Sequence, residues 1–336
     1  MTIRLSLQEL RALAETALIA SRTAPSNARE VALALVAADA DGLSSHGVSR
    51  VPAYADQALA GKVDGEAVPE VTQPAPSVVR VDARRGFAYP AITAGLARGS
   101  AVAAATGLAA VGIARSHHFG AAGYHAERAA QNGLVALIFG NTPAAIAPWG
   151  GSRPLFGTNP IACAFPRRDH PPLVIDLSLS KVARGKVMIA SQRGQPIPEG
   201  WALDADGRPT TDPQAALAGT MLPMGDAKGA ALVLMVELLA AALTGSNYGY
   251  EASSFFDAKG PPPEVGQLLL LLDPRAFGAG QFAPRVEVLL SQILAQPGAR
   301  LPGERRLAAR ALAQREGIEL TDALHADLQQ RARRAR

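Results

Sequence analysis

A histidine and an arginine one helical turn apart could act together on a small organic acid. His46 and Arg50 are four residues apart, so a helix through both places their side chains on one face. Imidazole titrates nearest to neutrality and can give a proton to a carbonyl or imine that receives a hydride. Guanidinium stays charged and can bind a carboxylate through two hydrogen bonds. The pair therefore predicts chemistry on a 2-oxo or 2-imino acid.

The same residues also fit an ordinary helix start. In that interpretation Ser44 or Ser45 is only the N-cap of a helix that continues through Ala60. His46 then lies in the first turn at the surface, and Arg50 is a solvated charge. The remainder of the chain has to decide between the two interpretations.

The elements that must position this pair follow from hydrophobic periodicity. Ser6 caps a helix that continues to Ala20, and a second predicted helix, capped by Ser26 or Asn27, continues to Ala40. Further along, apolar runs predict strands and longer periodic segments predict helices. The predicted strands are 77–81, 108–114, 135–139, 173–176 and 267–272, and the predicted helices are 89–106, 123–132 and 228–243.

This order of elements predicts an α/β fold with a discontinuous helical domain. The segment 301–330 predicts two helical pieces that pack back on the N-terminal helices. We therefore expect one helical domain from residues 1–70 plus 301–336, and an α/β domain from residues 71–300.

Composition excludes several classes of protein. Hydrophobic residues make up 48% of the 336 residues, which suits a globular protein with a substantial core. The net charge is +4, but arginines gather near the C-terminus and aromatic residues are only 5%, so we predict no nucleic-acid role. The apolar stretches are too short to span a bilayer. We expect no membrane association.

Cysteine usage and the N-terminus predict a cytoplasmic protein. Cys163 is the single cysteine, which excludes an intrachain disulfide and fits a reducing compartment. It lies in the apolar run 160–165, where a packed thiol is expected. The N-terminus lacks the basic and apolar pattern of a signal peptide.

The sequence has no Gly-x-Gly-x-x-Gly after a strand and no phosphate-binding loop of the Gly-x-x-x-x-Gly-Lys type. If a nucleotide binds, the segment 116–123 is the best candidate, because it follows a predicted strand and runs into a predicted helix whose N-terminus can face a pyrophosphate. His117 and His118 could instead be polar residues at a strand end or half of a metal site. No carboxylate or cysteine stands at ligand spacing, so we predict no metal.

Three further clusters predict loops in which backbone and small polar groups gather. They are 156–160, 176–178 together with 183–186, and 225–229. Each alone is ordinary turn chemistry, and Asp226 is predicted as the N-cap of the helix that follows. Their occurrence together in one chain is the informative observation.

Several motifs, in order from about residue 5 to 306, resemble the malate/L-lactate dehydrogenase family that lacks a Rossmann fold. The family includes sulfolactate and ureidoglycolate dehydrogenases and the piperideine- and pyrroline-2-carboxylate reductases. The motifs are Ser-His-Gly-Val-Ser-Arg at 45–50, His-His-Phe-Gly at 117–120, Ala-Pro-Trp-Gly-Gly at 147–151, Phe-Gly-Thr-Asn-Pro at 156–160, Ala-Arg-Gly-Lys at 183–186, Ile-Pro-Glu-Gly-Trp-Ala-Leu-Asp at 197–204, Pro-Thr-Thr-Asp-Pro at 209–213 and Arg-Leu-Pro-Gly-Glu-Arg-Arg at 300–306.

The resemblance implies a homodimeric enzyme with a non-Rossmann NAD(P)-binding α/β domain that reduces 2-oxo or cyclic 2-imino acids with NADH or NADPH. His46 would be the proton donor and Ser45 its polar partner. The residues implied to bind substrate are Arg50, Thr158, Arg184 and Lys186. Those implied to line the cofactor are His118, Phe119, Gly120, Ala121, Ala122, Asp176, Leu177, Ser178, Lys228, Arg300, Pro302, Gly303, Glu304, Arg305 and Arg306.

Two departures bear on the substrate. The branch that resembles the ketimine reductases has an aspartate after the Ala-Arg-Gly motif, where this chain has Lys186. A cation there would depress the protonated form of His46 and fits a substrate with a second anion, such as malate or sulfolactate, better. Ala227 also stands where many relatives carry a ring-bearing side chain, which leaves more room.

The leading prediction is therefore an NAD(P)-dependent 2-hydroxy acid dehydrogenase of the malate, lactate or sulfolactate type. The alternative within this chemistry is an NADPH-dependent pyrroline- or piperideine-2-carboxylate reductase. The alternative of another class is a non-catalytic nucleotide-binding protein on the same fold, because a fold does not fix a function.

Overall fold

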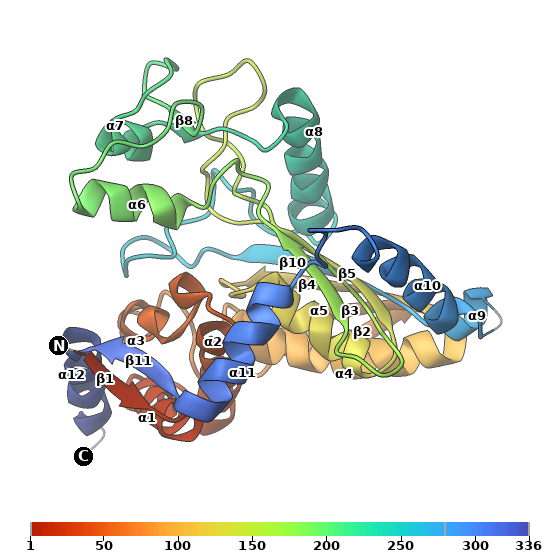
Figure 1. Ribbon diagram of the computed structural model, residues 1–336. Helices are drawn as coiled ribbons and strands as arrows, with labels where there is room; N and C mark the ends of the chain where they lie inside the picture. Colours follow the sequence, from red (N-terminus) through yellow and green to blue (C-terminus); the bar gives the residue numbers. More distant parts are fainter. Residues whose placement is uncertain (1, 279, 335–336) are drawn as a thin grey trace.

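A mixed β-sheet forms the centre of the computed structural model, which describes residues 2–278 and 280–334 (Figure 1). Within these residues the sheet has seven strands, and only the β3–β4 pair is parallel. In spatial order they are β2 (Glu70–Ala75), β3 (Val78–Asp82), β4 (Leu108–Ser116), β10 (Val265–Leu272), β5 (Val135–Gly140), β6 (Ile161–Phe165) and β7 (Leu173–Leu177).

Strand β10 is the central strand of the sheet, and both of its faces are covered. Leu269 and Leu271 join the core formed with α4 (Ala88–Thr106) and α5 (Ala122–Gln131). Leu268 packs on the opposite side, against α8 (Asp226–Glu237) and the π-helical turn η3 (Leu238–Ala242). A strand that is buried on both faces reads as a continuous apolar run, which is why 267–272 could be predicted from the sequence.

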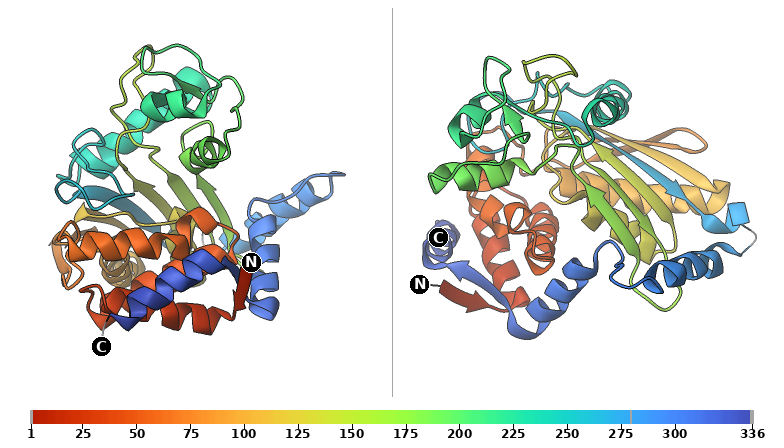
Figure 2. Two further views of the ribbon diagram at one scale, coloured as in Figure 1. Left: turned by 90° about the vertical axis from the view of Figure 1, so that its left-hand side faces the viewer. Right: turned by 45° about the horizontal axis from the view of Figure 1, so that its top comes forward.

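Smaller elements lie above the sheet on the α8 side (Figure 2). They are α6 (Arg184–Gln192), β8 (Ala202–Leu203), α7 (Pro213–Ala218) and β9 (Thr220–Met221). Beyond β10, α9 (Pro274–Gly278) and α10 (Phe282–Leu294) extend along the sheet edge, where Glu287 pairs with Arg167 at 2.7 Å.

The two ends of the chain pack together, as the sequence predicted. Helices α1 (Leu7–Ile19), α2 (Pro25–Ala40) and α3 (Val51–Leu59) share a core with α12 (Asp322–Arg333). Strand β1 (Thr2–Leu5) pairs antiparallel with β11 (Ile318–Thr321), and α11 (Glu304–Glu316) lies against α2. Figure 1 shows β1 and α12 side by side. No helix in the described ranges is long and apolar enough to cross a membrane.

A helix start was predicted correctly where a single sequence pattern determines it. Ser6 caps α1 in a reciprocal pair with Glu9, which is the predicted capping box. The second predicted cap is wrong, because α2 begins at Pro25 with Ala24 as its N-cap. Proline suits the first helical position, and Asn27 instead donates to the Gly65 and Ala67 carbonyls.

Elements that no local sequence pattern marks could not be predicted. Strand β2 is exposed at every residue, so it shows no alternation of apolar and polar side chains. Strand β6 was recognised only as the apolar run around Cys163. The predicted N-cap at Asp226 is also wrong, since Gly225 holds that position and Asp226 adopts a positive φ of 55° in the first turn.

Candidate active site

The segment that carries the histidine and arginine pair is not the single helix predicted from Ser44 to Ala60. It forms two 3-10 turns, η1 (Ser44–His46) and η2 (Val48–Arg50), before α3 begins. The cause is Asp39, whose carboxylate accepts a hydrogen bond from the Val48 amide at 2.7 Å and fills the space beside Gly47. A Cβ at residue 47 would lie 1.9 Å from that carboxylate.

His46 and Arg50 nevertheless come together. The Arg50 Nε donates to the Ser45 carbonyl at 2.7 Å, which folds the arginine back over the first turn. The Ser45 hydroxyl lies 3.0 Å from the His46 Nδ1. Among the described residues, the His46 Nε2 has no hydrogen-bond partner, so this nitrogen is free to exchange a proton with a bound molecule.

Burial makes His46 a neutral imidazole at physiological pH. The pKa of His46 falls to about 4, first because the ring is desolvated and then because the Arg50 charge is near. The expectation that Lys186 lowers the pKa of His46 is wrong, because the cation that contributes to this shift is Arg50. A neutral imidazole suits a group that accepts a proton from a hydroxyl.

The His118 ring stacks on the His46 ring, with centroids 5.6 Å apart and planes 27° apart. The Tyr54 hydroxyl contacts the His118 Nδ1 and lies 3.1 Å from the Tyr89 hydroxyl. Burial lowers the pKa of His118 well below its usual value. His118 therefore forms a neutral aromatic wall beside His46.

The neighbouring His117 points into the core. Its Nε2 donates to the Gln57 carboxamide oxygen at 2.6 Å, and burial lowers its pKa to about 3. The structure brings together no three acidic, cysteine or histidine side chains that could hold a metal, in so far as residues 2–278 and 280–334 show.

Three segments that were predicted to line a cofactor meet at the start of α5. The loop 117–121 connects β4 to α5, and the Gly123 amide donates to the Asp176 carboxylate on β7 at 2.7 Å. Burial raises the pKa of Asp176. A Cβ on Gly303 would lie 3.6 Å from the Val174 carbonyl, which places the segment 300–306 beside the same strand.

Arg306 differs from the other residues of that segment. It pairs with Asp41 at 3.1 Å and with Glu127 at 2.7 Å, so two carboxylates already occupy its guanidinium. Its Nε is buried and has no partner among the described atoms.

Backbone hydrogen bonds connect Thr158 and the residue before the α8 N-cap to the segment that follows β7. The Leu179 amide donates to the Thr158 carbonyl at 2.9 Å, and the Met224 amide donates to the Leu179 carbonyl at 2.8 Å. Lys228 is exposed in the first turn of α8, four residues beyond Met224.

The start of α6 lies next to the histidine turn. A Cβ on Gly185 would lie 3.9 Å from the Ser45 Cβ. Arg184 is half-buried, and its guanidinium makes only long hydrogen bonds, of 3.4 and 3.3 Å, to the carbonyls of Ala144 and Leu217. No described carboxylate pairs with it, and burial lowers its pKa. Lys186 is exposed.

Several residues of this site carried no recognisable signal in the sequence. Asp39 and Phe256 became candidates only through their contacts with Gly47 and Arg50. Tyr54 could have been found, because it stands four residues after Arg50 in the same stretch of chain.

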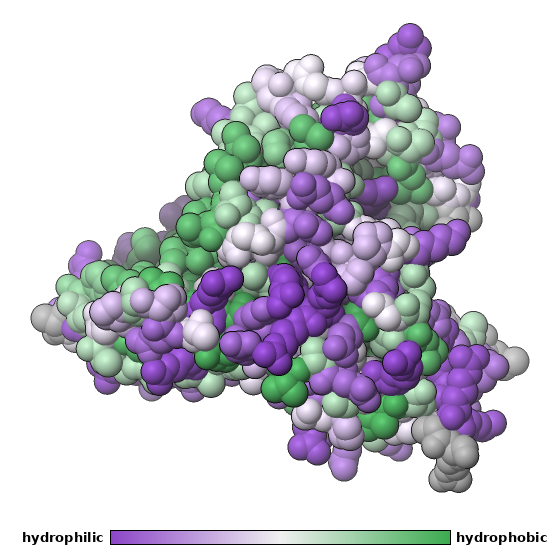
Figure 3. Space-filling model, turned by 180° about the vertical axis from the view of Figure 1, so that it is seen from behind, coloured by the Kyte–Doolittle hydropathy of each residue, from purple (hydrophilic) through white to green (hydrophobic). Residues whose placement is uncertain are grey.

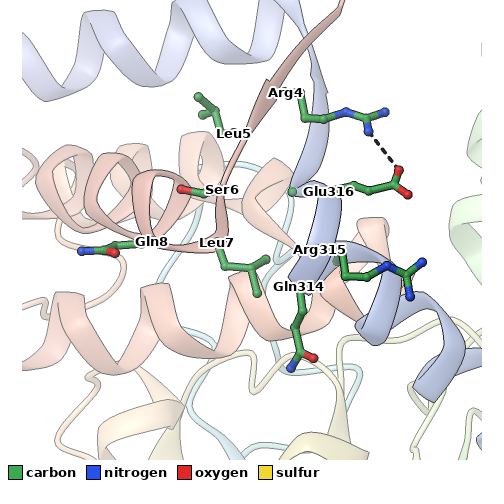
Figure 4. Close-up of a pocket in the computed structure, with 10 residues that line it drawn as sticks. Arg4, Leu5, Ser6, Leu7, Gln8, Gln314, Arg315 and Glu316 are labelled. Carbon is green, nitrogen blue, oxygen red and sulfur yellow. Dashed lines mark hydrogen bonds and ion pairs between the residues drawn. The ribbon is translucent and has the colours of Figure 1, made fainter.

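A separate cavity of about 390 Å³ lies between the β1–α1 junction and the end of α11 (Figure 4). Arg4 and Glu316, paired at 3.1 Å, stand at its rim. None of the predicted site residues lines it.

The chain is similar to known proteins over nearly its whole length. The family model for malate/L-lactate dehydrogenase matches residues 5–329. A (2R)-3-sulfolactate dehydrogenase (NADP(+)) from Chromohalobacter salexigens is 56% identical over 324 residues, 96% of each chain. A Δ1-pyrroline-2-carboxylate/Δ1-piperideine-2-carboxylate reductase from Pseudomonas putida is 42% identical over 95% of this chain and 94% of its own.

A solved structure is similar over nearly the whole chain. The Δ1-piperideine-2-carboxylate reductase of Pseudomonas syringae pv. tomato superposes with a TM-score of 0.93 at 41% identity, covering 98% of this chain and 100% of that one. The fold and these similarities define an enzyme of the oxidoreductase class. The chain belongs to the malate/L-lactate dehydrogenase family. The predicted family, fold class and enzyme activity are confirmed, and the non-catalytic alternative is disfavoured.

Proposed function

We propose that this enzyme interconverts a 2-hydroxy acid that carries a second anion, of the 3-sulfolactate type, and its 2-oxo acid, with NADP as the cofactor. The observation that carries the proposal is Arg184, a half-buried cation without a carboxylate partner, on the helix that approaches Ser45. The Chromohalobacter relative with that substrate and cofactor in its name is 56% identical.

The roles of the site residues follow from their contacts. Arg50 binds the substrate carboxylate, and His46 exchanges the hydroxyl proton through Nε2 while Ser45 supports Nδ1. We assign Arg184 and Lys186, both in the first turn of α6, to the second anion, and Thr158 to the same substrate. The chemistry that a nicotinamide nucleotide would supply in this site is the transfer of a hydride to or from substrate C2.

The residues at the start of α5 fit such a cofactor. Backbone amides at a helix N-terminus favour a phosphate group. Arg306, which pairs with Glu127 of the same helix, has a buried Nε without a partner among the described atoms. We assign to the cofactor the segments 118–122, 176–178 and 302–306, together with Lys228 and Arg300. We also propose that residues 1–70 with 301–336, and residues 71–300, are the two domains between which substrate and cofactor bind.

The test is NADPH and NADH oxidation with 3-sulfopyruvate, oxaloacetate, pyruvate and Δ1-pyrroline-2-carboxylate in parallel. We expect 3-sulfopyruvate with NADPH to give the highest kcat/KM. Arg184→Met should raise the KM for 3-sulfopyruvate about tenfold or more, because a charge-assisted hydrogen bond is lost, and should leave the KM for pyruvate within about twofold. An equal effect on both acids would contradict the role of Arg184.

The Pseudomonas putida reductase that matches at 42% identity supports the second candidate. If Δ1-pyrroline-2-carboxylate alone is turned over, that candidate replaces the first. Lys186 would then be compatible with imine reduction.

We propose a cytoplasmic homodimer. The support is a row of exposed apolar residues on α8 and η3, and Figure 3 shows hydrophobic residues along that side of the molecule. Leu234, Met235 and Leu238 are 45%, 39% and 49% exposed. Such a patch on a water-soluble surface marks an interface.

Sedimentation velocity tests this interface. We expect a dimer for the wild type and a monomer for Leu234→Glu, because a dimer would bury the new charge twice. The matched control is Leu289→Glu on α10, at a residue 62% exposed. A wild-type monomer, or a dimer that survives Leu234→Glu, would contradict the proposal.

A further inference from the structure

The loop 253–259 is fastened to the end of α3 by a buried lysine. Lys62 is 2% exposed, and its ammonium donates to the carbonyls of Ser254 at 2.6 Å, Asp257 at 3.0 Å and Lys259 at 2.6 Å. The Asp257 carboxylate is farther away, at 3.9 Å. All three protons of the ammonium group therefore bind the backbone of one loop, which lies about 190 residues away in sequence.

A second side chain of α3 holds the same loop. The buried Gln57 donates to the Phe255 carbonyl at 3.0 Å and accepts from His117 at 2.6 Å. The Phe255 ring in turn packs on His117 and His118, with centroids 5.4 and 5.0 Å apart. The loop thereby contacts both α3, the helix after Arg50, and His118, the ring that stacks on His46.

The loop places Phe256 under the Arg50 guanidinium. The guanidinium carbon lies 4.5 Å from the centre of the ring, which is a cation–π contact. The Arg50 Nε is held by the Ser45 carbonyl, so one edge and one face of the guanidinium are taken. The two Nη atoms have no partner among the described residues. They form the pair of donors that a carboxylate can accept end-on.

We propose that the loop 253–259 is a positioning element of the carboxylate site, in which Phe256 orients Arg50 and Lys62 fixes the loop that carries Phe256. The inference rests on the proposed function, since it assigns the substrate carboxylate to Arg50. Lys62 and Gln57 touch no reacting group and act only through the loop.

Steady-state kinetics test the role of Phe256. Phe256→Leu should raise the KM for the 2-oxo acid about tenfold, because a guanidinium without its aromatic support binds the carboxylate less well. The kcat and the KM for NADPH should stay within about twofold, since Arg50 binds ground state and transition state alike. The control Phe277→Leu, at a residue 66% exposed on α9, should match the wild type. An unchanged KM in Phe256→Leu would overturn the proposal.

A double-mutant cycle tests whether Lys62 acts through Phe256. Lys62→Met should reproduce the rise in KM, and the double variant should be no worse than about twice the worse single variant. If the two substitutions raise the KM by independent factors that multiply in the double variant, Lys62 does not act through Phe256 and only supports folding. A lower kcat in Lys62→Met alone would lead to the same conclusion.

A readout without turnover separates this inference from the proposed function. In ¹⁵N-arginine-labelled protein, the Nε–H resonance of Arg50, assigned by its loss in Arg50→Lys, should shift in Phe256→Leu and in Lys62→Met but not in Phe277→Leu. If the wild type reduces no 2-oxo or 2-imino acid while these shifts occur, the proposed function fails and the positioning of Arg50 stands. If the resonance does not move in Phe256→Leu, the positioning fails.

Discussion

Replacing His46 by glutamine is expected to lower kcat by about a thousandfold. Proton transfer by a positioned side chain contributes about 10²- to 10⁴-fold to a rate, and glutamine keeps the polarity of imidazole but cannot exchange a proton. Both directions of the reaction should lose the same factor, because the same group gives and takes the proton. The measurement is kcat with saturating NADPH and 2-oxo acid.

The control for this variant is His170→Gln, at an exposed histidine outside the site. It should leave kcat unchanged. A His46→Gln variant with more than a tenth of the wild-type kcat would show that the proton comes from another group or from water.

The pH profile of the wild type tests the lowered pKa of His46. Oxidation of the hydroxy acid needs neutral His46, and its pKa in the free enzyme is lowered to about 4. The kcat/KM for oxidation should therefore hold from neutral pH down to about pH 5 and fall below it, instead of falling near 6.5. An acid limb near 6.5 that disappears in His46→Gln would contradict the burial of this ring.

Replacing Glu127 by glutamine is expected to lower the free energy of unfolding by about 3–5 kcal/mol, the usual cost of removing one partner from a buried ion pair. Glu127 is 3% exposed and binds Arg306 and Arg310, each at 2.7 Å. Burial alone would raise its pKa, but hydrogen bonds from these arginines hold the pKa below its usual value. The variant leaves two cations with Asp41 as their single buried carboxylate.

Urea unfolding measures this loss, and Glu316→Gln is the matched control. Glu316 also pairs with an arginine, Arg4 at 3.1 Å, but both side chains are about half exposed, so the loss should be below about 1 kcal/mol. Equal effects of the two substitutions would show that the buried cluster does not fasten α11 to α2 and α5.

The residues proposed here as proton donor and carboxylate ligand could be singled out from the sequence because chemistry and spacing coincide over a few residues. His46 and Arg50 are so close along the chain that they remain neighbours even though the segment is broken into two 3-10 turns. The conformation itself could not be predicted, because it depends on Asp39, whose carboxylate reaches the backbone of residues 47 and 48 from another helix.

By itself, the sequence determined the capped helix α1, the strands with a strong apolar run and the chemical types of the candidate site residues, since each depends on neighbours a few positions away. Tertiary structure alone decided that β10 enters between β4 and β5, that α11 ties Asp41 to Glu127, and that Phe256 lies under Arg50. These contacts join residues up to about 265 positions apart. Their free energy comes from burial and charge pairing that exist only after the chain has folded, so no local pattern records them.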